Sequence, residues 1–187
     1  PEVMTPVGPF VGYERSMLDA DEAGLRNFAK LCVRTGTTTI TDLASRMDEK
    51  TVDMMLRVTG EPNYPVRLMP FRFFMGLSAK ELIAAVLALK ERTTDRLRMG
   101  QIKIIVDGSI QGFSARLRWP GYHNDAPNGL WYIAPEHLSE LLHLALEAGL
   151  QVHTHTNGDQ ATQLVLEKLA PALQKHPNPN HRFTLQH

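Results

Sequence analysis

Segments with strand character alternate with segments of helical character along almost the whole of this 187-residue chain. The strand-like segments are short, rich in β-branched residues and largely apolar. Apolar strands need cover on both faces, and the crossover helices between parallel strands supply it. We therefore predict one α/β domain over residues 1–187. The expected strands are residues 37–43, 65–73, 101–107, 151–155 and 182–187, and the expected helices are residues 19–36, 49–59, 78–93, 135–149 and 159–175.

Two local signals refine these bounds. Ser78 precedes its helix and Glu81 follows three residues later, which is the spacing of a capping box. Pro70 lies inside the second expected strand and has no N–H to donate, so it indicates a bulge or an early end there.

The charge balance excludes several classes of partner. Twenty basic and twenty acidic residues cancel, so no net field attracts nucleic acid or an anionic membrane. No apolar run approaches the roughly 18 residues of a membrane span. Cys32 is the single cysteine, which excludes an internal disulfide and favours a reducing compartment, the cytoplasm. We expect Cys32 to be a core residue on its helix rather than a nucleophile.

Histidines end two successive expected strands. His153 and His155 are two residues apart and so point to the same side of their strand, and His187 ends the next one. Parallel strands bring their carboxyl ends to one edge of the sheet, where the sites of α/β barrels lie. Imidazoles suit Zn²⁺. Considered alone, the three are equally compatible with polar residues satisfied at strand ends.

Lys103 is an anomaly in the apolar strand of residues 101–107, on the same side as Asp107. An unpaired ammonium is costly to bury. The lysine could extend its charge to solvent or pair with Asp107. It could also have a depressed pKa that allows CO₂ to carboxylate it, giving an oxygen ligand that bridges two metals. Strand parity leaves these alternatives open.

A long segment rich in glycine and proline, residues 108–133, carries four aromatic side chains that could contact a substrate or anchor the loop: Trp119, Tyr122, His123 and Trp131. Loops of this length in compact domains are usually functional or disordered. We take Trp119, together with Asp107 and His153, as the candidate substrate contacts. Asp42 and Asp159 are better explained as a turn residue and a first-turn carboxylate.

The motifs around these residues resemble those of the metal-dependent amidohydrolase superfamily, and more specifically its amidohydrolase-3 branch, which contains N-substituted formamide deformylase-like proteins. The similarity extends in order from Lys103 to His187, whereas residues 1–102 share only the alternation of strand and helix. The segments that carry it are Lys103 with Val106-Asp107-Gly108-Ser109-Ile110-Gln111-Gly112, then His155-Thr156-Asn157-Gly158-Asp159-Gln160-Ala161, then Arg182 to His187.

The resemblance implies a distorted TIM barrel with one or two divalent metals, usually Zn²⁺. Lys103, His155 and His187 would be its metal ligands and catalytic residues, with Lys103 carboxylated in a two-metal site, and His153 would line the site. Metal-activated water would then attack a small-molecule substrate at a C–N bond that is not a peptide bond, such as an amide or formamide.

The chain departs from the family pattern in two places. The His-x-His of the first barrel strand is absent, since His153-x-His155 follows several strand–helix units, and the aspartate of the eighth strand would lie beyond His187. We therefore expect an internal fragment, a partial barrel of roughly strands 2–6 of 8, which is inactive alone and could form a homo-oligomer through its open sheet edges. The alternative is a non-catalytic α/β binding or regulatory domain. A third alternative, a phosphate-binding barrel enzyme, is disfavoured because the sequence has no glycine-rich phosphate loop.

Overall fold

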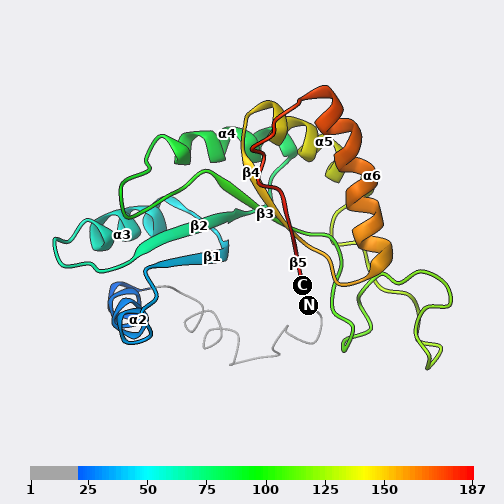
Figure 1. Ribbon diagram of the computed structural model, residues 1–187, viewed down its shortest axis with the longest axis horizontal. Helices are drawn as coiled ribbons and strands as arrows, with labels where there is room; N and C mark the ends of the chain where they lie inside the picture. Colours follow the sequence, from blue (N-terminus) through cyan, green and yellow to red (C-terminus); the bar gives the residue numbers. More distant parts are fainter. Residues whose placement is uncertain (1–20) are drawn as a thin grey trace.

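The computed structural model describes residues 21–187, in which five parallel strands form a curled sheet with helices along its outer side (Figure 1). The strands lie side by side in chain order, β1-β2-β3-β4-β5, without the reversal that marks a doubly wound sheet. The predicted α/β partial barrel is thereby confirmed. The strands are β1 (Thr39–Ser45), β2 (Arg67–Phe73), β3 (Gln101–Ile105), β4 (Gln151–His155) and β5 (Thr184–Gln186).

The helices follow the sequence signals closely. The capping box is present, with Ser78 and Glu81 bonding to each other's backbone N–H, and Asp21 and Asp48 cap two further helices. The predicted start of the first helix, Asp19, lies outside the described residues. Among residues 21–187 no helix is both long and apolar enough to cross a bilayer. The helices are α2 (Glu22–Arg34), α3 (Glu49–Thr59), α4 (Ala79–Lys90), α5 (Pro135–Glu147) and α6 (Asp159–Lys175).

The sheet has an apolar outer face and a polar inner one. On β3, Ile102 and Ile104 are fully buried against α4, α5 and α6, whereas Gln101 and Lys103 alternate with them and face the other way. A second apolar cluster lies between β2 and the helices α2 and α3, and it includes Cys32 as expected. Because the helices cover only the outer face, polar side chains on the inner face are free to form a site.

The irregularity predicted at Pro70 falls on the neighbouring strand. Pro70 pairs with Asp42, and the register between β1 and β2 shifts between Asp42 and Ser45. Within this shift the Asp42 carboxylate accepts a hydrogen bond from the backbone N–H of Ala44 at 3.2 Å. The bulge thus lies in β1, and β2 continues through Pro70 to Phe73.

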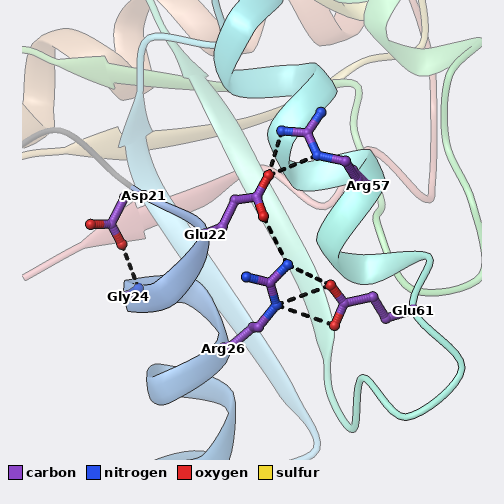
Figure 2. A network of polar contacts seen from close by, with 6 residues as sticks. All are labelled: Asp21, Glu22, Gly24, Arg26, Arg57 and Glu61. Carbon is purple, nitrogen blue, oxygen red and sulfur yellow. Dashed lines mark hydrogen bonds and ion pairs between the residues drawn. The ribbon is translucent and has the colours of Figure 1, made fainter.

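A network of exposed charges joins α2 to α3 and to the turn that follows α3 (Figure 2). Arg26 pairs with Glu22 at 2.8 Å and with Glu61 at 2.6 Å, and Glu22 also pairs with Arg57 at 2.5 Å. Its members are partly or largely exposed, so water and salt screen these attractions. This network is therefore a surface feature of the β1–β2 half of the molecule.

Candidate functional site

The predicted site residues gather where β3, β4 and β5 run side by side. Lys103 lies beside His153, and His155 lies between Ile105 and Gln186. Paired residues on neighbouring strands share a face, so Lys103, His153, His155 and Gln186 all project from the inner face. His187 follows β5 directly. The carboxyl ends of three adjacent strands thus carry polar side chains to one place.

Lys103 belongs to a hydrogen-bonded chain that crosses the three strands. Its Nζ donates to Oε1 of Gln186, and Nε2 of Gln186 donates to Nδ1 of His153 at 3.1 Å. His153 Nε2 lies 2.9 Å from the side-chain amide of Gln151, and its ring lies 4.3 Å from that of Phe71. Because Gln186 presents its nitrogen, Nδ1 of His153 accepts this hydrogen bond.

Burial governs the protonation of Lys103 and His153. Lys103 is only 6% exposed, and desolvation lowers the pKa of its amine below the usual 10.5. Desolvation also lowers the pKa of His153, and the charge of Lys103 lowers it further. Lys103 does not pair with Asp107, which was one of the alternatives for it. A lowered pKa increases the share of neutral amine, the form that reacts with CO₂.

The tautomer of His155 is fixed by its neighbour. Its Nε2 lies 2.9 Å from the carbonyl oxygen of Gly108, and because a carbonyl can only accept, Nε2 carries the proton. The side-chain N–H of Asn157 donates to the same oxygen at 2.8 Å, so its 3.5 Å approach to Nε2 joins two donors and is no bond. The lone pair of His155 therefore lies on Nδ1.

His155 and His187 adjoin each other, with ring centroids 4.4 Å apart. A zinc–nitrogen bond is about 2.0–2.1 Å long, so this ring separation is compatible with two imidazole ligands on one ion. Lys103 lies deeper in the sheet, beside His153 rather than His155. Within residues 21–187 there is no group of three His, Cys, Asp or Glu side chains that could hold a metal. The structure therefore brings His155 and His187 together and leaves Lys103 beside His153, and their metal-binding role stays a prediction.

Asp107 is fully buried just after β3. Its Oδ1 accepts the backbone N–H of Asn157 at 2.8 Å, and its Oδ2 accepts those of Gly158 at 2.8 Å and Arg116 at 2.9 Å. A substrate contact of Asp107 stays a prediction. The three bonds tie together the ends of β3 and β4 and the loop between them.

The loop of residues 108–133 is held against these strand ends by its own side chains. The Arg116 guanidinium lies 4.7 Å from the centre of the Trp131 ring and donates to the carbonyl oxygen of Gly129 at 2.9 Å. Tyr122 donates to the carbonyl oxygen of Ala115 at 2.9 Å. These aromatics anchor the loop. Trp119 differs, because it is 94% exposed, and its substrate contact stays a prediction.

Three polar residues of this region were not predicted as site residues from the sequence: Gln151, Asn157 and Gln186. Each contacts a predicted histidine or its hydrogen-bond partner. Strand parity could have found two of them. Gln151 is two residues before His153 on the same strand, and Gln186 pairs with His155 on the neighbouring strand, so both share the inner face with a histidine. Asp159 pairs with the loop, its carboxylate accepting the backbone N–H of Arg118 at 2.9 Å, as a first-turn residue of α6.

A cavity of about 720 Å³ lies at the opposite end of the sheet. It is lined by the first residues of the strands, among them Thr39, Arg67 and Gln101, and by the cations Arg98 and Arg182. In α/β barrels the amino-terminal end of the strands serves stability and the carboxyl end serves chemistry. We therefore place the candidate site at the carboxyl end, away from this cavity.

Residues 8–187 match the Amidohydrolase family. The chain belongs to that family. The predicted superfamily is confirmed, and the formamide deformylase-like branch stays a prediction. Among curated proteins, YtcJ of Bacillus subtilis (strain 168), named as an amidohydrolase, is 35% identical over 86 residues, which are 46% of this chain and 16% of YtcJ. The Arabidopsis thaliana protein LONG AFTER FAR-RED 3 is 25% identical over 178 residues, which are 91% of this chain and 30% of that protein.

Solved structures support the fold. An uncharacterized metal-dependent hydrolase from Pyrococcus horikoshii OT3 superposes with a TM-score of 0.65 at 17% identity, over 90% of this chain and 33% of its own. Another from Pyrococcus furiosus superposes with a TM-score of 0.63 at 19% identity, over 81% of this chain and 31% of its own. The chain thus spans about a third or less of the proteins that it resembles.

Proposed function

We propose that the whole protein that carries this sequence is a metal-dependent hydrolase of a non-peptide C–N bond, such as that of an amide or formamide. The observation that carries the proposal is the pair His155 and His187, whose rings adjoin at the carboxyl ends of β4 and β5. Family membership supports the hydrolase class. The relatives are far longer than this chain, so the similarity does not show the activity of the whole protein, and we propose it.

In this proposal His155 and His187 hold a divalent ion, with Zn²⁺ the natural choice for imidazole ligands. His155 contributes Nδ1, because Nε2 is engaged with Gly108. The neutral amine of Lys103 would add CO₂ and lose a proton to give a carbamate, whose oxygen would be a third ligand. Lys103 Nζ donates to Gln186, and Gln186 in turn donates to His153. When bound, the ion lowers the pKa of a water ligand and polarises the bond to be cleaved.

The inner face supplies the remaining functions. His153 is neutral and borders Lys103, so it contributes a polar wall without a competing positive charge. The anchored loop of residues 108–133 lies over the same strand ends and is the natural wall for a substrate, with Trp119 as its exposed aromatic side chain. A further metal ligand, beyond Lys103, His155 and His187, would come from another part of the whole protein.

Metal binding tests the first part of the proposal. Elemental analysis of the whole protein should find a divalent metal, and chelator competition should give its affinity. His155→Ala and His187→Ala should each weaken Zn²⁺ binding by at least about 100-fold. Mutating a residue that only hydrogen-bonds to a metal ligand already lowers metal affinity by about 10- to 100-fold, and losing the ligand itself should cost more.

His181→Ala is the matched control, since His181 is an imidazole that lines the cavity at the other end of the sheet. Its Zn²⁺ affinity should equal that of the wild type. A wild-type protein without metal under every loading condition, or histidine variants that bind like the control, would favour the non-catalytic binding domain instead.

Substrate class is tested separately with the metal-loaded protein. Small N-substituted formamides and amides, a dipeptide and a phosphate monoester would be compared for product formation. We expect turnover of the formamides or amides that stops when a chelator removes the metal. Turnover of the phosphate ester alone, or turnover that persists without metal, would contradict the proposal.

A further inference from the structure

The proposed function gives no role to the fully buried carboxylate of Asp107 at the base of the site. We propose that Asp107 is a positioning residue for His155: it clamps the turns after β3 and β4 so that the Gly108 carbonyl keeps His155 in its Nε2–H form, with the lone pair on Nδ1. The use of that lone pair for metal rests on the proposed function. The clamp itself does not.

The clamp consists of three backbone amides on one carboxylate. Two of them, Asn157 and Gly158, belong to the turn between β4 and α6, and the third, Arg116, belongs to the long loop. Hydrogen bonds to an ionised acceptor are stronger than neutral ones. Asp107 has no exposed surface, so water cannot replace an amide partner that is lost. The geometry of both turns therefore depends on this one side chain.

The clamp holds both partners of the His155 hydrogen bond. Gly108, whose carbonyl accepts from Nε2 of His155, is the residue bonded to Asp107 in the chain. Asn157, whose backbone N–H Asp107 holds, donates its side-chain amide to that same carbonyl at 2.8 Å. The carbonyl is thereby fixed from two sides. With the carbonyl fixed, a proton on Nδ1 would leave Nε2 facing oxygen without a hydrogen.

Close packing leaves the two turns little room to adjust by themselves. A Cβ on Gly108 would overlap the hydroxyl of Ser114, and one on Gly158 would overlap the carbonyl of Arg116. Both turns therefore press directly against the loop. The carboxylate of Asp107 lies where these three segments meet, and it supplies acceptors for one buried and two part-buried backbone amides.

Asp107→Asn tests the clamp, because it keeps the size of the side chain and replaces one acceptor oxygen by a donor that faces backbone N–H groups. Asp159→Asn is the matched control: Asp159 also accepts a backbone N–H of the loop, from Arg118, but touches neither Gly108 nor His155. Asn157→Ala is a milder variant that removes only the side-chain bond to Gly108. The tautomer of His155 is read by ¹⁵N NMR of the metal-free whole protein, with His155→Ala for assignment.

We expect the wild type and Asp159→Asn to show the Nε2–H form of His155, and Asp107→Asn to show a mixture of both neutral forms. Zn²⁺ affinity, measured by chelator competition, should fall about 10- to 100-fold in Asp107→Asn. It should fall less in Asn157→Ala and stay within about twofold in Asp159→Asn. A role confined to stability would lower the melting temperature of Asp107→Asn and leave the His155 spectrum unchanged.

A folded Asp107→Asn with the wild-type tautomer overturns the proposal. If that variant does not fold, Asn157→Ala decides: a tautomer mixture supports the clamp, and a wild-type spectrum overturns it. A wild type that binds no metal but whose tautomer responds to Asp107→Asn supports the clamp and contradicts the proposed function. The two failures are thus distinguishable.

Discussion

The two ends of the parallel sheet differ in what they contain. The amino-terminal end has the cavity, about 720 Å³ in volume and bordered by the cations Arg67, Arg98 and Arg182. The carboxyl end has the adjoining rings of His155 and His187 and the clamped turn at Asp107. Space alone therefore does not mark the candidate site.

The two ends also differ in which polar atoms are fixed. At the carboxyl end, hydrogen bonds decide which atom of Gln186 faces His153 and which nitrogen of His155 carries a proton. Among the cavity-lining cations, Arg67 and Arg182 are exposed. Ligand binding and catalysis need preorganised groups, because a group already in place costs no ordering when the ligand arrives. The following changes should break or sharpen this contrast.

Lys103→Met should have the largest effect. It removes the proposed third metal ligand. Metal-dependent turnover should therefore fall by more than about 100-fold, which exceeds the loss expected from mutating only a hydrogen-bond partner of a ligand. The metal-free protein should be at least as stable as the wild type, because a thioether replaces a buried amine whose pKa desolvation already lowers. Steady-state kinetics and thermal melts measure the two effects. Retained turnover would remove Lys103 from the site.

His153→Gln should change the pH dependence of stability at the carboxyl end. The folded protein holds the pKa of His153 below its usual value of 6.5, so below that pH the unfolded chain binds a proton that the folded chain does not. Stability from this group is complete above pH 6.5 and is lost as the pH falls through and below it, with a slope of at most about 1.4 kcal/mol per pH unit.

Denaturant unfolding of both metal-free proteins between pH 7.5 and about 5 gives the comparison. The wild type should lose more stability than His153→Gln over this range. Equal losses would mean that His153 is protonated as readily in the folded chain as in the unfolded one.

Arg67→Ala probes the cavity end. Arg67 begins β2 and is exposed, so its removal should change the free energy of unfolding by no more than about 0.5 kcal/mol. Zn²⁺ affinity and turnover should equal those of the wild type. A loss of either comparable to that of Lys103→Met would mean that the ends of the sheet are not functionally distinct.

Arg26→Ala should have the smallest effect. It breaks the exposed pair with Glu22 within α2 and the exposed pair with Glu61 in the turn that follows α3 (Figure 2). Salt screens such pairs, so the small loss in melting temperature seen at low ionic strength should vanish at about 1 M salt. A loss that persists in high salt would indicate that Arg26 contributes through packing rather than charge.

The sequence was most informative where the interactions are local. The capping box of Ser78 and Glu81, the bounds of α3 and α6 and the apolar pattern of β3 all depend on residues a few positions apart. The last strand was predicted too long. Its expected first residue, Arg182, has a φ of 50°, and the backbone N–H of Phe183 donates to the His181 ring, so pairing begins only at Thr184.

The site was predicted in its residue types and less well in its connections. Strand parity placed His153 and His155 on one side of their strand, and Lys103 on the same side as Asp107. Lys103 meets Gln186, 83 positions away, instead of Asp107. Asp107 meets backbone amides 9, 50 and 51 positions away. Every residue except proline has a backbone N–H, so the residue types at these positions could not predict that they bond to Asp107.

Anomalous X-ray diffraction at the zinc edge, from crystals of the whole protein loaded with Zn²⁺, tests the central claim most directly. The account predicts a peak at the carboxyl ends of β4 and β5, about 2.0–2.1 Å from Nδ1 of His155 and within bonding distance of His187. It would be contradicted by a fully occupied zinc in the cavity lined by Arg67 and Arg182, or by a loaded crystal with no peak at His155.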